Sequence, residues 1–571
     1  MRGCNRWLVF FCGALLALSL RAEVKPLVVA ESDSFHSLTY GLSAFCQAAD
    51  FPFALTEINS AASELLFVPN LAGVDVQNRL CWAAVEDGSR TNDSTVSVAI
   101  LPTLDNGATV LRALEAFYPV RTTDADGRIW RYAHFAAATN LPADSAFNVP
   151  EMAVFAAIHQ GHVVVSTARA GVEWGMRNIP PAGNSVAKAG QVRIEIKPAA
   201  VAAMMKKDRE TQAHDLPDEG MSTEGVERLL ADLSALTLVL DATADGITVQ
   251  MTAVPRPDSL LAKMSTQLRM PAERMWRMAP DNAALVVVEG GADARGFLRE
   301  YDLLPENKLT KGTLANVGAW DEHGDVVLYV DHNSAAGIYL AAVQVVTNRD
   351  RAWAQALATP QALLPMAPTV AMVTNGVRNM AGCRVVDFSF TPAKGPRTTA
   401  PNFMDMALVM QPAMTLSVAM TNDLMISVLG RSNAVEQVLR RLQEPVTNGT
   451  PALLARCRKQ LPDLPAAPFF VAQIGPVALM RMIVDALPSE TADLRVAFPQ
   501  PGDGLTAVMV TETNGAMRFV LRVPANEVSR VKTAAEKAQT AVRDGFSHMA
   551  VEQMFQKRDG DLPPEMPLPK K

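Results

Sequence analysis

The sequence predicts an α+β fold: a tandem duplication of one antiparallel-rich α+β domain, followed by a C-terminal amphipathic helix. Two observations lead to this prediction. Blocks of similar sequence recur in the same order in both halves of the 571-residue chain. Within each half, short apolar runs are separated by tight-turn signals and interrupted by segments of helical periodicity, a pattern typical of antiparallel strands mixed with helices.

The most conspicuous recurrence is a pair of predicted β-hairpins. LTLVLDATADGITVQM, residues 236–251, carries Asp-Gly between two apolar runs, and LRVAFPQPGDGLTAVM, residues 494–509, has the same spacing. Asp-Gly between alternating runs is a strong short-range hairpin signal. We therefore expect Asp245-Gly246 and Asp503-Gly504 to form equivalent turns in two copies of one domain.

Four further blocks match in the same order. The first strand of each copy is expected at LVVAE (27–31) and LVVVE (285–289). The other pairs are residues 98–114 with 340–357, 154–179 with 416–442, and 192–205 with 470–483. Each match is weak alone, and it is their shared order that indicates a duplication.

These boundaries predict six segments. In chain order they are a signal peptide (1–22), the first α+β repeat (23–262), a linker with a short helix (263–284), the second α+β repeat (285–524), a C-terminal helix (525–558) and a disordered proline-rich tail (559–571).

The N-terminus has the plan of a secretory signal peptide. Two arginines precede an uncharged apolar run over residues 7–20, and small residues follow. This run is shorter than the roughly 20 residues that a membrane-spanning helix needs. We expect cleavage between Ala22 and Glu23, with Ser19 as the alternative site, and a secreted or periplasmic protein.

The charge and hydropathy of the mature chain restrict the classes of partner that it can bind. Loss of the signal peptide removes three arginines and leaves 49 basic against 59 acidic residues, a formal charge of −10. Nucleic-acid binding requires clustered basic residues, so we expect no nucleic-acid partner. No other run of 18 uninterrupted apolar residues occurs, so no transmembrane span is expected in the mature chain.

Four cysteines remain after cleavage. An even number in an exported protein permits disulfides, and the most direct pairing is Cys46 with Cys81 and Cys383 with Cys457. The alternative is four buried thiols, because a core of this size needs no covalent links. We expect the first bridge more than the second.

Comparison of the two copies gives one candidate site. Glu31 and Glu289 end the first predicted strand of each copy, and strand ends can line a cleft between repeats. The alternative is an ordinary surface position. The catalytic motifs G-x-S-x-G and H-E-x-x-H, the Walker loop and G-x-G-x-x-G do not occur. We therefore expect no catalytic residues, no cofactor and no metal site.

The sequence therefore indicates an exported, non-catalytic cell-envelope protein that binds or scaffolds an unknown envelope protein or a small apolar ligand. Two alternatives remain open. One is an exported hydrolase whose acidic catalytic residues are dispersed in the sequence, which motifs cannot reveal. The other is a carrier of an apolar ligand, which the 49% apolar content favours.

Overall fold

The computed structural model describes most of the chain between Lys25 and residue 540. The described ranges are 25–51, 55–86, 95–133, 153–180, 187–188, 190–211, 223–291, 301, 324–333, 335–363, 370–392, 414–444, 450–464, 467–486 and 498–540. The expected signal peptide with its Ala22–Glu23 cleavage site, and the proline-rich tail, lie outside these residues.

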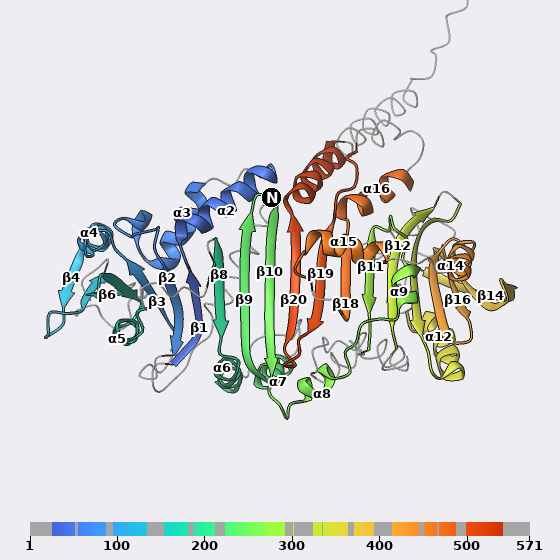
Figure 1. Cartoon of the computed structure of the whole chain (residues 1–571), viewed down its shortest axis with the longest axis horizontal. Helices are drawn as coiled ribbons and strands as arrows, with labels where there is room; N and C mark the ends of the chain where they lie inside the picture. Colours follow the sequence, from blue (N-terminus) through green and yellow to red (C-terminus); the bar gives the residue numbers. More distant parts are fainter. Residues whose placement is uncertain are drawn as a thin grey trace, which may run out of the picture.

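Twenty strands in the described residues join into one large sheet (Figure 1). In chain order they are β1 (Lys25–Ser32), β2 (Leu80–Glu86), β3 (Thr95–Pro102), β4 (Val120–Thr123), β5 (Trp130–Ala133), β6 (Ala153–His159), β7 (His162–Ser166), β8 (Gln191–Ile196), β9 (Leu233–Thr243), β10 (Gly246–Pro255), β11 (Leu285–Glu289), β12 (Val326–Asn333), β13 (Gly337–Val345), β14 (Val370–Met380), β15 (Cys383–Pro392), β16 (Met414–Met420), β17 (Leu424–Gly430), β18 (Phe470–Ile474), β19 (Leu505–Thr511) and β20 (Met517–Pro524).

The pairing order repeats on the two sides of the sheet. From the middle outwards, the first side runs β10-β9-β8-β1-β2-β3-β7-β6-β5-β4, and the second runs β20-β19-β18-β11-β12-β13-β17-β16-β15-β14. Each of these neighbouring pairs is antiparallel, as is the central pair. Together with the helices, this confirms the prediction of a mixed, antiparallel-rich α+β protein.

The two sides meet in the pair formed by β10 and β20. Eight residues of β10, from Gly246 to Ala253, lie opposite Pro524 to Met517 of β20. Gln250 lies opposite Val520 near the middle of this contact. The sheet therefore continues from one half of the chain into the other without a break.

Helices lie on both faces of the sheet. They are α2 (Phe35–Ala48), α3 (Leu55–Leu66), α4 (Ala108–Phe117), α5 (Arg169–Arg177), α6 (Pro198–Thr211), α7 (Thr223–Ala231), α8 (Leu260–Ser265), α9 (Glu273–Met278), α12 (Arg349–Leu363), α14 (Ala434–Gln443), α15 (Ala452–Gln460) and α16 (Pro476–Ala486), with a 3-10 turn at Pro69–Leu71. Residues 525–540, called the C-terminal helix below, are also helical.

Local sequence explains where several helices begin. The hydroxyl of Ser34 accepts a hydrogen bond from the main-chain N–H of Ser37 and caps α2. Pro198 and Pro476 open α6 and α16, where a proline costs no helical hydrogen bond. Both prolines follow a short strand directly, so each strand passes immediately into a helix.

The two faces of the central strands differ in chemistry. Asp241, Thr248 and Arg522 lie in one cross-strand row, and the face they share is called the groove face below. The neighbouring row, with Leu240 and Val249, belongs to the opposite, apolar face. Alternation of polar and apolar residues along a strand separates the two kinds of side chain in this way.

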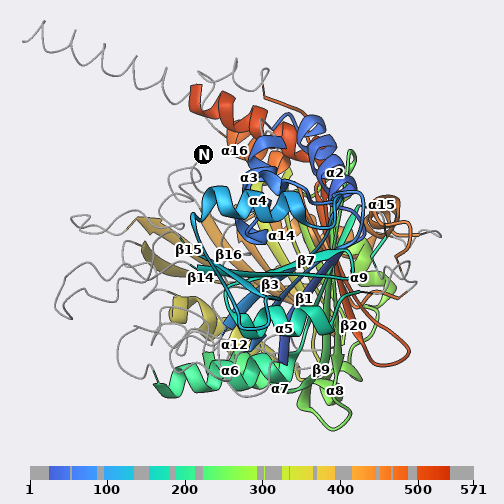
Figure 2. The same cartoon turned by 90° about the vertical axis from the view of Figure 1, so that its left-hand side faces the viewer.

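The helices divide between these faces. On the groove face, α5 packs on the first half, and α9, α14 and α15 pack on the second. On the apolar face, α2, α4 and α6 pack on the first half and α12 on the second. In Figure 2, α2, α3, α4 and α16 lie above the strands, and α5, α6, α7 and α12 lie below them. This grouping follows the ends of the strands and not the faces, because α2 and α6 both pack on the apolar face.

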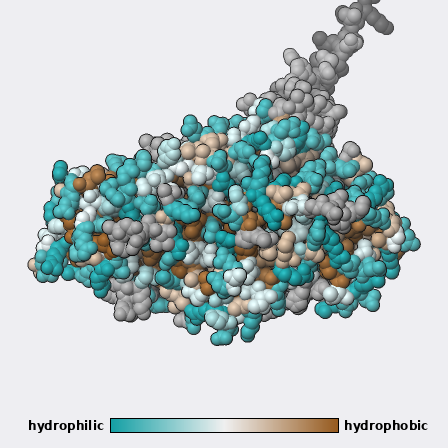
Figure 3. All heavy atoms as spheres, viewed as in Figure 1, coloured by the Kyte–Doolittle hydropathy of each residue, from teal (hydrophilic) through white to brown (hydrophobic). Residues whose placement is uncertain are grey.

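The side chains of the central strands are mostly half-buried, unlike those of β2 and β3. Strands β2 and β3 are almost wholly buried, whereas most residues of β9, β10 and β20 are of intermediate exposure. In the space-filling view, hydrophobic residues are visible along the middle of the molecule between hydrophilic margins (Figure 3). The middle of the sheet is therefore less completely covered than β2 and β3.

The second predicted hairpin is wrong. Asp503-Gly504 precedes β19 and does not join two strands, whereas Asp245 does lie in the turn between β9 and β10. The second hairpin is instead formed by β19 and β20, whose connection contains Asn514-Gly515. Pro499 and Pro501 explain the error, because proline cannot donate to a strand ladder.

The expected disulfide is also wrong. Cys46 and Cys81 are free thiols, as are Cys383 and Cys457. Cys46 lies on α2, whose Gly41 packs against Ala242 on the apolar face. Cys81 is buried beneath α5 on the groove face, so the sheet separates the two sulfur atoms.

Two further helices fall within the segments defined from the sequence. A short helix, α9, lies in the predicted linker, and the predicted C-terminal helix is present over residues 525–540. Within the described ranges, no helix has the length and apolar character needed to cross a membrane.

Candidate functional site

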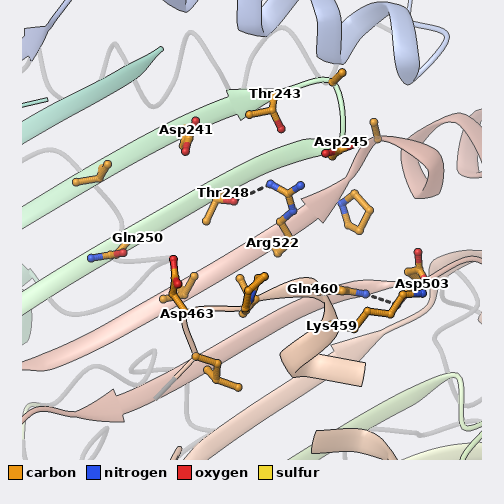
Figure 4. A pocket seen from close by; sticks show the side chains of 18 of the residues that line it. Asp241, Thr243, Asp245, Thr248, Gln250, Lys459, Gln460, Asp463, Asp503 and Arg522 are labelled. Carbon is orange, nitrogen blue, oxygen red and sulfur yellow. Dashed lines mark hydrogen bonds and ion pairs between the residues drawn. The ribbon is translucent and has the colours of Figure 1, made fainter. Parts of the chain in front are cut away.

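A groove of about 820 Å³ lies on the groove face where the two halves of the sheet meet. It is called the central groove below, and Figure 4 shows it from close by. Its floor is formed by β9, β10 and β20, which continue one another through their hydrogen-bonded ladders. Its size falls in the range of small-molecule sites.

Alternate side chains of these strands form the floor, and most of them are polar. β9 contributes Asp241 and Thr243, and β10 contributes Thr248 and Gln250. β20 contributes Arg522, whose Nη1 donates to Thr248 Oγ1 at 2.8 Å. The floor thus presents hydrogen-bonding groups from both halves of the chain.

One wall is the segment that ends α15 and continues beyond it, residues 459–464. Gln460 fixes it by donating from Nε2 to the main-chain oxygen of Asp503 at 2.7 Å. Gln473 of β18 donates to the same oxygen at 3.0 Å. The wall therefore has hydrogen-bonded support from the neighbouring strand.

The charges of the lining are balanced. Four basic residues and four aspartates face the groove: Lys188, Lys459, Arg518 and Arg522, and Asp241, Asp245, Asp463 and Asp503. Lys459 lies 3.7 Å from the Asp503 carboxylate, and Arg518 lies 3.3 Å from Glu512. A lining of this kind is complementary to a ligand without large net charge.

The groove also has an apolar part. Val239 and Val520 lie on its floor, and Leu461 and Leu464 lie in the wall. Apolar side chains beside a few convergent polar groups are typical of sites that bind organic ligands.

The candidate site expected from the sequence is not assembled. Glu31 lies in the row of β1, β8 and β9 that belongs to the groove face, and its Oε2 accepts from Arg79 Nη2 at 2.6 Å. Glu289 lies in the row of β11, β18 and β19 that belongs to the apolar face. Six strands separate β1 from β11, a span of about 34 Å at 4.8 Å per strand. The structure does not bring the two glutamates together.

The residues of the central groove are not among the candidate residues predicted from the sequence. They come from segments more than 200 positions apart, such as Thr248 and Arg522. The available signal was the recurrence of polar residues at alternate positions of otherwise apolar strands, as at Thr248 and Gln250. Among the described side chains, no cluster of three or more His, Cys, Asp or Glu residues suited to a metal occurs.

Comparison with known proteins adds no assignment: no family model, no curated protein and no solved structure matches the chain.

Proposed function

We propose that the chain is an exported, non-catalytic protein of the cell envelope that binds a ligand or partner in the central groove. One observation carries this proposal: the groove is built jointly by β9 and β10 of the first half and β20 of the second. A site of this kind exists only when both halves are folded together. It combines half-buried charged groups with apolar surface, as binding sites do.

The chemistry of the lining favours binding over catalysis. The described residues that line the groove include no histidine, cysteine or serine. These are the side chains that most often act as nucleophile or general base. An exported hydrolase that uses dispersed aspartates is the alternative, and turnover of a bound ligand by the purified protein would distinguish it.

Export is tested by fractionating a bacterial host that produces the full chain. The expected product lacks residues 1–22 and lies outside the cytoplasm. The double variant Leu15→Arg/Leu16→Arg interrupts the apolar run and should remain inside with its N-terminus intact. Intact wild-type chain in the cytoplasm would contradict export.

Binding is tested by native mass spectrometry of the exported chain, compared with its mass after denaturation. A bound molecule should appear as extra mass in the native spectrum and should be depleted in Arg522→Gln but not in Arg440→Gln. Arg440 is a matched control because it forms an exposed helix pair with Glu436. A bare wild-type chain, even after incubation with envelope extract, would oppose the proposal.

We also propose that the two halves arose by tandem duplication. The repeated strand order supports this, and so does the register. His162 begins β7 and Leu424 begins β17. These two residues are 262 positions apart, the same spacing as between the starts of the matched blocks 154–179 and 416–442. Pro198 and Pro476 occupy the same place after β8 and β18. In this arrangement Gln250 and Val520 lie on a pseudo-twofold axis that passes through the floor of the central groove.

A carrier of an apolar ligand is the second candidate, and the apolar face favours it. Side chains in the middle of this face are half-buried: Leu238, Leu240, Val249, Met251, Ala507, Met509, Phe519 and Leu521. A fluorescent apolar probe should then bind the exported protein and be displaced by a long-chain fatty acid. Loss of that signal in Val249→Asp, with unchanged binding in the groove, would assign the ligand to this face.

A further inference from the structure

The floor of the central groove holds two opposite charges that do not neutralise each other. Gln191, Asp241, Thr248 and Arg522 form one row across four neighbouring strands. Asp241 and Arg522 lie two strands apart, so their Cα atoms are separated by about 10 Å. Thr248 lies between them.

Each charge is held by a neutral neighbour. Arg522 donates from Nη1 to Thr248 Oγ1, so the guanidinium extends over β10 (Figure 4). Asp241 Oδ2 accepts from Gln191 Nε2 at 3.1 Å. Within the described part of the chain, neither side chain forms an ion pair, although both are half-buried. Partly desolvated charges gain most when a ligand supplies the missing counter-charge.

The separation of the two groups sets the length of the ligand. The Arg522 guanidinium leans towards β10, so it lies closer to the Asp241 carboxylate than the two Cα atoms lie to each other. No ion pair joins them, so the gap exceeds salt-bridge distance. An extended dipeptide spans about 7 Å between its amine and its carboxylate.

We propose that the central groove binds a zwitterionic ligand of dipeptide size, with its ammonium group at Asp241 and its carboxylate at Arg522. The planar guanidinium retains donors that suit two-point binding of a carboxylate. Val520, in the next row on the groove face, and Leu461 of the wall provide apolar contacts for the ligand's side chains. This inference rests on the proposed binding function and specifies its ligand class.

Several features of the groove select against other ligands. The balanced lining gives no net attraction to a polyanion or a polycation. An apolar molecule would leave the Asp241 and Arg522 charges desolvated without partners, which is unfavourable. A ligand with both terminal charges satisfies both groups at once.

The experiment is calorimetric titration of the exported chain with dialanine, N-acetyl-dialanine and dialanine amide. Dialanine should bind, and each blocked peptide should bind at least tenfold more weakly, because it lacks one of the two charges. Equal affinity for the three peptides would overturn the inference, and so would the lack of any binding up to millimolar concentration.

Two variants assign the two ends of the peptide. Arg522→Gln should weaken dialanine at least tenfold and leave dialanine amide unchanged, since the amide already lacks the carboxylate. Asp241→Asn should weaken dialanine at least tenfold and leave N-acetyl-dialanine unchanged, since that peptide already lacks the ammonium group. Arg440→Gln should change none of these values. If a variant fails to fold, as judged by circular dichroism, the wild-type comparison of blocked and free peptides still decides.

The result can be separated from a failure of the proposed function. If the native mass spectrum shows a bound molecule that is not zwitterionic, and dialanine does not bind, the ligand class is wrong but the binding function stands. If dialanine does not bind and the exported chain remains bare in extract, both fail.

Discussion

Lys532 of the C-terminal helix forms two hydrogen bonds with Asp50, a residue 482 positions earlier in the chain. Its Nζ donates to the main-chain oxygen of Asp50 at 2.6 Å and to Oδ2 at 2.7 Å. Asp50 follows α2 in the first half, and Lys532 follows β20 in the second. The contact therefore ties the two halves together at one end of the central strands.

Replacement of Lys532 by Met should lower the melting temperature slightly. The pair is exposed, so its contribution should disappear at about 1 M salt. The hydrogen bond to Asp50 raises the pKa of Lys532, so the folded chain holds this proton more tightly. The difference between wild type and variant should be complete below the pKa of an unfolded lysine and vanish as pH rises through the folded value. Lys537→Met, on the same helix, is the control.

Replacement of Glu527 by Ala should be far more costly. Its carboxylate is completely buried and accepts hydrogen bonds from the main-chain N–H groups of Val477 and Gly504. Loss of the carboxylate leaves two buried donors unpaired, at about 1–3 kcal/mol each. We expect unfolding by urea to show a loss of about 3 kcal/mol. The exposed Glu536→Ala should leave the midpoint unchanged, and similar midpoints for both variants would contradict this role.

Replacement of Gly41 by Ala tests the packing of α2 on the hairpin of β9 and β10. A Cβ at Gly41 would overlap the main-chain oxygen of Ala242. Overpacking costs about 1–3 kcal/mol, whereas the gain in helix propensity from Gly to Ala is about 1 kcal/mol. The overlap involves rigid backbone, so we expect net destabilisation in thermal unfolding. Gln47→Ala, at an exposed position of the same helix, should be neutral, and a stabilised Gly41→Ala would show that α2 lies further from the hairpin.

Because the thiols of Cys81 and Cys457 are buried, we expect the folded chain to lose stability at alkaline pH and both thiols to be unreactive in the native state. Burial raises the pKa of both Cys81 and Cys457 to about 12. The folded state then keeps protons that the unfolded thiols lose above about pH 9, so stability should fall with rising pH by up to about 1.4 kcal/mol per pH unit and thiol. The double variant Cys81→Ala/Cys457→Ala should flatten this dependence. A thiol reagent at neutral pH should modify both residues only after unfolding, and rapid modification of the native chain would contradict their burial.

Local structure, such as a tight turn, could be predicted from the sequence more accurately than the way in which distant strands assemble into the sheet. The turn at Asp245-Gly246 follows from short-range chemistry, and the structure has it between β9 and β10, where the sequence predicts it. The second hairpin was misplaced because Asp503-Gly504 imitates a turn signal. The flanking Pro499 and Pro501 were the evidence against it.

The central groove could not be predicted, because it depends on register between distant strands. A one-residue change of register moves a side chain to the other face of a sheet. Glu31 and Glu289 illustrate this: both end a matching LVV segment, yet they lie on opposite faces. Asp241 and Arg522 show no relation in sequence and come into one row only because β10 pairs with both β9 and β20.

The pairing of β10 with β20 also means that each half, taken alone, would end its sheet in an unpaired edge strand. A chain cut within residues 263–284 would leave β10 and β20 as long unpaired edges, each offering its hydrogen-bonding groups to any other strand. The junction between the halves is thus also a safeguard against aggregation. Selection on β10 and β20 acts on their fit to each other, so the two halves are constrained to change together.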